Sequence, residues 1–170
     1  LLRLGAIHER LGKVEVAAAS YQKVLSLDAG DGAALAAMEA LYARTERWDD
    51  LVGVHRRRIE LENDPQQREQ LYAQMAGVFE ERLGRPDDAI AAYREVLALD
   101  DTSHVALVAL DGLFTRQQRW DDLAENLEAQ LALADDPALQ SQLMLRLADL
   151  RETRMGQVET AIDIYNQVLE

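Results

Sequence analysis

The sequence contains no cysteine, which excludes disulfide bonds and thiol catalysis. Only three prolines and nine glycines occur among its 170 residues, which leaves little room for long loops. Aromatic residues make up 5% of the chain, whereas alanine and leucine are abundant, and this balance suits helix packing better than a β-sandwich. No apolar run approaches the roughly 20 residues of a membrane-spanning helix. The composition therefore favours packed helices without a membrane span.

Positive charge is also scarce, since 18 lysines and arginines face 31 aspartates and glutamates, giving a formal net charge of −13. Such a field disfavours nucleic acid and anionic membrane surfaces and favours basic partners. The simpler interpretation is that the charge keeps the protein soluble. The lack of cysteine fits the cytoplasm and the periplasm equally, and we favour the cytoplasm.

Motifs that would indicate catalysis are missing. The three histidines, His8, His55 and His104, lie far apart, so no metal-ligand spacing exists, and we expect them on helix surfaces or half-buried. The nucleophile-elbow, P-loop and dinucleotide-binding glycine motifs are absent. Paired acids such as Asp49 and Asp50 recur at predicted helix starts, where capping explains them better than acid–base chemistry. We therefore expect a protein that is not an enzyme, with no catalytic residues, no metal and no cofactor.

A 72-residue repeat dominates what the sequence does contain. When residues 1–70 are placed on residues 73–142 without a gap, 26 of the 70 pairs are identical. Tyr21, Tyr93 and Tyr165 fall in register. A fixed period of this kind is typical of stacked arrays, in which each unit buries its apolar face against its neighbours. Such arrays usually bind other molecules, so the repeat indicates a class of function without naming the partner.

Apolar residues recur three and four positions apart, which indicates amphipathic helices rather than strands. Breaks separate these stretches, with Gly12, Gly84 and Gly156 suited to left-handed helix C-caps and Pro86 and Pro137 suited to first-turn positions. The pattern predicts ten helices in five units, at about 1–31, 32–66, 67–103, 104–138 and 139–170. No linker interrupts them, so we expect residues 1–170 to form a single array. Both ends fall inside helical patterns, which indicates a fragment of a longer protein.

Two charged ladders accompany the units. Arginine recurs near the end of each first helix, at Arg10, Arg44, Arg82, Arg116 and Arg154. Acids recur five residues later, at the favourable start of each second helix, at Glu15, Asp49, Asp87, Asp121 and Glu159. We expect these arginines to return over the turn and pair with the acids, for about 0–1 kcal/mol each if exposed. The alternative is an arginine stripe that grips a partner's carboxylates.

One basic run, Arg56, Arg57 and Arg58, has no counterpart in the second block. Because the fold does not require it there, a functional role stays open. We interpret it as a solvated helix face. Trp48 and Trp120 are in register, and we interpret them as hydrophobic cornerstones of the hairpins rather than stacking platforms.

These features resemble the tetratricopeptide repeat (TPR) family, and the resemblance covers the whole chain. Alternate steps of 34 residues between corresponding positions match that family's unit. Gly12, Ala17 and Tyr21 resemble the second half of its pattern, and Gly5 and Gly77 match the small residue that lets two helices cross closely. The family's initial tryptophan is missing, and the alternate units are degenerate. The resemblance implies an all-α, right-handed α-solenoid of five TPR-like helical hairpins.

The resemblance also implies where a partner would bind, because the first helices of successive TPR hairpins line a concave groove. Carrying the alignment over selects two positions on each first helix: Leu2, Ala6, Ala36, Ala40, Gln74, Val78, Val108, Gly112, Arg146 and Leu150. Most are small or apolar, which suits a peptide or amphipathic helix with basic flanks. Alternatively, the small residues only permit tight curvature and bind nothing.

The expected function is therefore a non-enzymatic protein–protein interaction scaffold that binds a protein or peptide, not nucleic acid and not a membrane. The alternative is a structural module that self-associates as a homo-oligomer through its repeat ends. The predicted last helix carries Ile162, Ile164 and Val168 with no following hairpin to cover them, and the first begins uncapped at Leu1. Neither the partner's identity nor the native length follows from the sequence.

Overall fold

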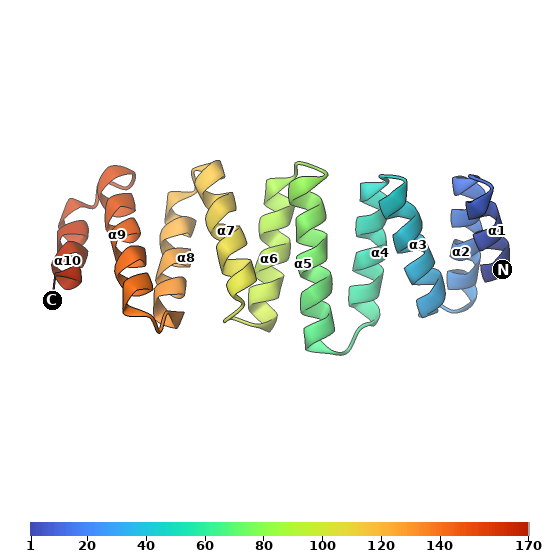
Figure 1. Cartoon of the computed structure of the whole chain (residues 1–170), viewed down its shortest axis with the longest axis horizontal. Coiled ribbons are helices and arrows are strands. Elements are labelled where there is room, and N and C mark those ends of the chain that lie inside the picture. The colour runs from blue at the N-terminus through green and yellow to red at the C-terminus, as the bar shows by residue number, and fades with distance from the viewer. Residues whose placement is uncertain (170) are drawn as a thin grey trace. The chain divides into compact units, whose positions relative to one another are not determined.

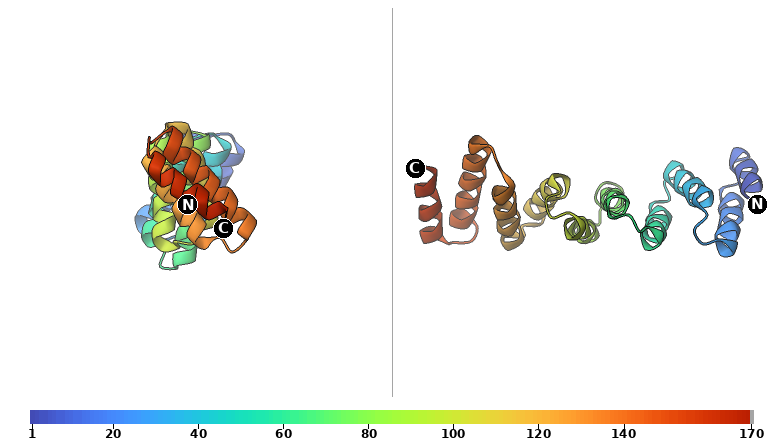
Figure 2. Two further views of the ribbon diagram at one scale, coloured as in Figure 1. Left: turned by 90° about the vertical axis from the view of Figure 1, so that its left-hand side faces the viewer. Right: turned by 90° about the horizontal axis from the view of Figure 1, so that it is seen from below.

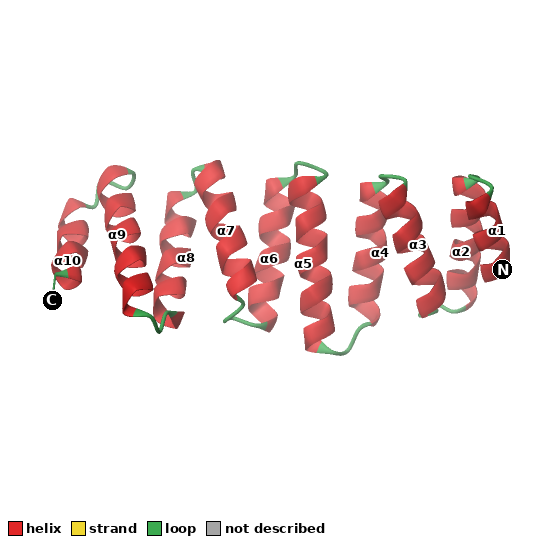
Figure 3. Ribbon diagram, in the orientation of Figure 1, coloured by secondary structure: helices red, strands yellow, loops and turns green. Residues whose placement is uncertain are grey.

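The computed structural model describes residues 1–169, which form ten α-helices and no strand (Figure 3). The helices are α1 (Leu2–Arg10), α2 (Val14–Leu27), α3 (Gly32–Arg44), α4 (Trp48–Leu61), α5 (Pro65–Glu81), α6 (Pro86–Leu99), α7 (His104–Gln117), α8 (Trp120–Leu133), α9 (Pro137–Thr153) and α10 (Val158–Val168). The predicted all-α array of helical hairpins is confirmed, while its right-handed course stays a prediction. In the described part of the chain, no helix has the length and apolar character needed to cross a membrane.

The chain divides into two compact units, Leu1–Ala92 and Tyr93–Glu170, with the boundary inside α6. In the first unit α1 packs on α2, α2 on α3, α3 on α4 and α4 on α5 (Figure 1). In the second unit α7 packs on α8, α8 on α9 and α9 on α10. Helices inside each unit are therefore covered by the helices that precede and follow them, as in other repeat arrays.

The turn inside each hairpin places one residue in the left-handed region. Gly12, Gly84 and Gly156 have φ values of 70°, 60° and 68°, as their predicted capping role requires. In the alternate hairpins Glu46 and Gln118 adopt the same conformation, with φ values of 57° and 56°. A β-carbon makes this conformation unfavourable by roughly 1–2 kcal/mol. The degenerate hairpins therefore keep the turn geometry at the expense of local strain.

Replacing Glu46 or Gln118 by glycine is expected to raise the free energy of unfolding by about 0.5–1 kcal/mol each. The relief of strain exceeds the extra flexibility that glycine gives the unfolded chain. Urea denaturation followed by tryptophan fluorescence measures this, because Trp48 reports on the first unit and Trp120 on the second. Gly12→Ala, at the same turn position, is the matched control and should destabilise. A loss of stability in the glycine variants would contradict the strain argument.

Helix starts are set by local side chains. Asp31, Asp64 and Asp136 each accept a hydrogen bond from a backbone N–H two or three residues later, at 2.8, 3.0 and 3.2 Å. These contacts satisfy amides that have no partner within the helix. Helices α5, α6 and α9 begin at a proline, whose fixed φ suits the first turn. The predicted first-turn positions of Pro86 and Pro137 are confirmed.

Tyr21 fills the crossing between α1 and α2. Its side chain is 2% exposed, Ala17 beside it is fully buried, and its hydroxyl donates to Glu9 Oε2 at 2.9 Å. Burial and the Glu9 carboxylate raise the pKa of Tyr21 to about 12. A Cβ at Gly5 would lie 2.4 Å from Tyr21 Cε1, so the close crossing expected at Gly5 is confirmed. At Gly77 a Cβ would meet no heavy atom within 4 Å, and close crossing does not explain that glycine.

Candidate functional site

The candidate binding surface of the first unit lies on its first helices, and we call it the first-helix surface. Helices α1 and α3 lie on one side of this unit, and α2 and α4 on the other (Figure 2). Leu2 and Val78 are half-buried and pack against the core. The remaining predicted residues of this unit are exposed: Ala6, Ala36, Ala40 and Gln74.

Helix α3 contributes most to this surface. Its exposed side carries Ala33, Ala36, Ala40 and Ala43. Spacings of three and four residues bring these side chains onto one face of the helix. We call these four residues the alanine face. Because no side chain extends beyond a methyl group there, a partner's backbone could approach α3 closely.

In the second unit the predicted residues lie on α7 and α9. Val108 is 50% exposed, Gly112 is half-buried and Arg146 is exposed. Leu150, in contrast, is only 5% exposed. It extends the buried stripe that Leu143 and Leu147 begin on α9, at spacings of four and three residues. Leu150 is therefore a core residue in this structure, and we leave it out of the surface.

Arg146 is held by an ion pair within the protein. Its Nη1 and Nη2 donate to Oδ2 and Oδ1 of Asp111 at 2.9 and 2.8 Å, a bidentate geometry that links α9 to α7. The Asp111 side chain is 13% exposed, and Gln130 Nε2 also reaches Oδ2 at 3.3 Å. Hydrogen bonding to Asp111 raises the pKa of Arg146 against the opposing effect of burial. The Arg146 guanidinium therefore joins α9 to α7, and Asp111 already neutralises its charge.

Glu39 occupies the position of Asp111 in the first block and is held differently. His55 Nε2 lies 3.4 Å from Glu39 Oε1, and Arg58 pairs with the other carboxylate oxygen. The His55 hydrogen bond, with help from Arg58, lowers the pKa of Glu39 although burial opposes the shift. His55 is 3% exposed, so the expected surface or half-buried location is wrong for this histidine. The repeat places it at a core position that Leu127 fills in the second block.

Two of the three arginines in the basic run also have partners within the fold. Arg57 Nη2 donates to the carbonyl oxygen of Leu25 at 3.1 Å and Nε to that of Ala29 at 3.3 Å. These carbonyls lie at or just beyond the end of α2, where the carbonyl oxygens of the last helical turn lack N–H donors within the helix. With Arg58 on Glu39, only Arg56 keeps the expected exposed character. The interpretation of the run as a solvated face is wrong for Arg57 and Arg58.

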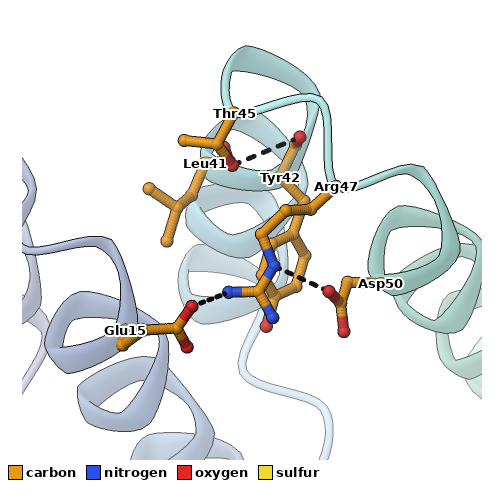
Figure 4. A network of polar contacts seen from close by, with 6 residues as sticks. All are labelled: Glu15, Leu41, Tyr42, Thr45, Arg47 and Asp50. Atoms are coloured by element: carbon orange, nitrogen blue, oxygen red, sulfur yellow. Dashed lines mark hydrogen bonds and ion pairs between the residues drawn. The ribbon is translucent and has the colours of Figure 1, made fainter.

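The acids that begin the second helices are held by arginines that immediately precede those helices. Arg47 Nη1 donates to Glu15 Oε1 and Nε donates to Asp50 Oδ2, both at 2.7 Å (Figure 4). The Arg47 guanidinium also lies 4.9 Å from the centre of the Tyr42 ring. Arg47 therefore connects α2 to the start of α4 across the hairpin boundary.

The same arrangement recurs at Arg85, which donates to Asp49 Oδ1 at 3.0 Å and to Asp88 Oδ2 at 2.6 Å. The predicted pairing of Glu15 and Asp49 with arginines at the ends of the first helices is therefore wrong. Of those arginines, Arg44 pairs with Glu9 at 2.9 Å.

Two further members of the predicted arginine ladder lie over the tryptophan rings. Arg82 is 5.3 Å from the Trp48 ring centre and Arg154 is 5.4 Å from that of Trp120. Trp48 is half-buried and packs against the core, as expected of a hairpin cornerstone. The repeated string of arginine, tryptophan and two aspartates includes both residues of the Arg47–Asp50 contact. The other partner of Arg47, Glu15 on the preceding second helix, could not be identified from residue spacing alone.

Across residues 1–169, no group of three or more histidine, aspartate or glutamate side chains is arranged to hold a metal ion. His55 does contact the carboxylate of Glu39, but the other partner of that carboxylate is Arg58, which is not a metal ligand. These polar contacts join helices to one another.

Comparison with solved structures supports the fold. A crystal structure of MamA is 17% identical with a TM-score of 0.54, and the match covers 98% of this chain and 92% of that one. The crystal structure of YrrB, described as a TPR protein with an unusual peptide-binding site, is 14% identical with a TM-score of 0.54, covering 99% and 82%. At these identities the likeness concerns the fold alone. No curated protein matches the sequence.

Family models of the tetratricopeptide repeat match almost the whole sequence, at residues 1–31, 34–69, 70–103, 106–141 and 142–170. The matches include the degenerate units as well as the regular ones. The helical hairpins, the left-handed turn residues and the small residue at Gly5 agree with this assignment. The chain therefore belongs to the tetratricopeptide repeat family.

Proposed function

We propose that this chain is a non-enzymatic interaction scaffold whose first-helix surface binds a peptide or an amphipathic helix. Its TPR repeats support a role in protein interaction. The observation that carries the finer proposal is the alanine face of α3, with exposed Ala6 on α1 and Gln74 on α5. An apolar face docked there would gain roughly 25 cal/mol for each Å² removed from water.

Charge favours a basic partner. The net charge is −13, and several arginines, including Arg47, Arg58 and Arg146, are already paired with acids of the chain. The excess of acids therefore faces solvent. A partner with lysine or arginine flanks would be attracted, and the attraction should weaken as salt rises.

A panned peptide library tests this proposal directly. Peptides of about 16 residues selected on the wild-type chain are expected to carry lysine or arginine beside an apolar stripe. The double variant Ala36→Arg with Ala40→Arg should weaken their binding at least tenfold, about 1.4 kcal/mol, because it adds bulk and positive charge to the alanine face. Isothermal titration calorimetry measures the change.

Ala19→Arg is the matched control, because Ala19 is an exposed alanine on α2, on the other side of the unit (Figure 2). It should leave the affinity unchanged. If the double variant and the control bind every selected peptide as tightly as the wild type, binding on the first-helix surface is ruled out.

A second candidate function is self-association through the terminal helices. Leu4, Ile7 and Leu11 on or next to α1 are 46%, 51% and 63% exposed, and Val158 and Ile162 on α10 are 51% and 52% exposed. Apolar helix faces of this kind are normally covered by a neighbouring repeat. Light scattering across a hundredfold range of concentration distinguishes this alternative, which requires the mass to rise above that of a monomer.

A further inference from the structure

A pocket opens between α2 and α4 of the first unit, and we call it the α2–α4 pocket. Leu25, Leu35, Met38 and Tyr42 form its apolar floor. Its volume is about 260 Å³. Sites for small-molecule ligands usually measure about 300–1,000 Å³, so this pocket is better matched to one large side chain of a partner.

The α2–α4 pocket is separate from the first-helix surface. Successive residues of an α-helix are rotated by about 100°, so Leu35, Met38 and Tyr42 project from α3 on the side opposite to Ala36 and Ala40. The pocket is lined by these α3 residues together with residues of α2 and α4, and α2 and α4 lie on the side of the unit away from α1 and α3 (Figure 2). A ligand in the pocket and a ligand on the alanine face would not compete directly.

The second unit shows which features the fold itself imposes. A smaller pocket of about 180 Å³ lies 72 residues further along the chain, with an equivalent floor: Leu97, Leu107, Leu110 and Phe114. Its rim differs, because Arg94 replaces Gln22 and Glu125 replaces Gly53. The apolar floor is thus a property of the repeat, whereas glycine at the rim distinguishes the pocket of the first unit from that of the second.

Gly53 is the residue that makes this rim unusual. It lies in the middle of α4, where glycine is less favourable than alanine because it loses more conformational freedom on folding. A Cβ at this position would meet no heavy atom within 4 Å, so helix packing does not require glycine. The effect of Gly53 in the structure is to leave the wall of the α2–α4 pocket without a side chain.

Acids flank the opening. The side chains of Asp49 and Asp50 line the pocket and are 77% and 45% exposed. Arg85 bonds Oδ1 of Asp49 and Arg47 bonds Oδ2 of Asp50, and each carboxylate has a second oxygen that can accept further hydrogen bonds. Within the pocket lining, Arg57 is directed to the carbonyl oxygens at the end of α2.

We propose that the α2–α4 pocket receives one large apolar side chain, such as phenylalanine or leucine, from a partner segment that carries lysine or arginine next to it. The floor supplies the apolar contact, Gly53 provides access, and Asp49 with Asp50 complements the neighbouring positive charge. The proposal adds a second anchoring point beyond the first-helix surface and does not require a ligand on that surface.

Short designed peptides test this pocket. The probe is a nine-residue peptide with a central phenylalanine, two lysines on each side and a glycine–serine background. NMR of the Met38 methyl group, one of only four methionines, reports on the floor, and the Gly53 amide reports on the rim. The probe should shift both signals saturably. An alanine-centred probe with the same lysines should bind at least tenfold more weakly, as should a phenylalanine probe flanked by glutamates.

Variants separate the pocket from other surfaces. Gly53→Leu should reduce affinity for the phenylalanine probe at least tenfold. Because leucine has a higher helix propensity than glycine, this variant should remain folded, and weaker binding can be attributed to the filled rim. Glu125→Leu, at the equivalent position in the second unit, and the Ala36→Arg, Ala40→Arg variant should leave the Met38 titration unchanged.

Three results would overturn the proposal. They are an unshifted Met38 signal, equal binding of the alanine-centred probe, and wild-type affinity in Gly53→Leu. A Met38 shift that depends on protein concentration without any probe would instead assign the pocket to a second copy of the chain. The two proposals are tested independently. Binding on the first-helix surface is tested with library peptides and the Ala36→Arg, Ala40→Arg variant, so its failure would not change the result expected for the phenylalanine probe.

Discussion

Replacing Tyr21 by alanine is expected to lower the free energy of unfolding of the first unit by about 3–5 kcal/mol, the usual loss for a buried aromatic side chain. The ring is 2% exposed and fills the α1–α2 crossing, and the hydroxyl donates to Glu9. Urea denaturation followed by Trp48 fluorescence measures the change, in a Trp120→Phe background so that the signal comes from the first unit only.

Two related variants show which part of Tyr21 is responsible. Tyr21→Phe removes only the hydroxyl and should cost about 1 kcal/mol. Tyr165 occupies the same repeat position on α10 but is half-buried, with its hydroxyl 3.2 Å from Glu152 Oε2. Tyr165→Ala, read from Trp120 in a Trp48→Phe background, should therefore lose roughly half as much as Tyr21→Ala. Equal losses would mean that burial does not decide the cost.

Gly5→Ala is the second large effect and should destabilise the first unit by about 1–3 kcal/mol, the range for overpacking a well-packed core. The new Cβ would lie 2.4 Å from Tyr21 Cε1 and 2.8 Å from two further ring atoms. Because the ring is buried, it can move only by displacing its neighbours. The same urea measurement in the Trp120→Phe background detects the loss.

Gly53→Ala is the matched control, a glycine-to-alanine change inside another helix of the same unit. Its Cβ has open space around it, so the change should stabilise by about 0.5–1 kcal/mol. The double variant Gly5→Ala with Tyr21→Ala should lose less than the sum of the single losses, because the clash disappears with the ring. Additive losses in the double variant, or equal losses of stability in Gly5→Ala and Gly53→Ala, would contradict the steric explanation.

The elements that sequence reasoning identified correctly are governed by neighbours along the chain. A glycine that must adopt positive φ and a proline in a first turn both act within a few residues, so Gly12 and Pro137 could be read from their immediate context. The 72-residue period indicated a stacked array, and the steps of 34 residues with Gly12, Ala17 and Tyr21 carried the resemblance to the family.

The candidate site was predicted less completely. Exposed positions such as Ala36 and Ala40 follow from the alignment, but Leu150 follows the buried stripe of α9 instead. His55 occupies the repeat position that Leu127 fills in the second block, and nothing in the sequence indicates its buried contact with Glu39. The α2–α4 pocket was not anticipated at all, because its floor and rim come from three helices whose separation no spacing rule specifies.

The amino-acid sequence alone determined that this protein is an array of helical hairpins, where its helices start and turn, and which positions repeat. These properties depend on short-range backbone preferences and on periodicity. The tertiary structure alone decided that Glu15 meets Arg47 rather than Arg10, and that Gly53 borders an opening. Such choices depend on how closely helices distant in sequence approach each other, and a difference of a few ångströms selects which charge is paired and which surface is open.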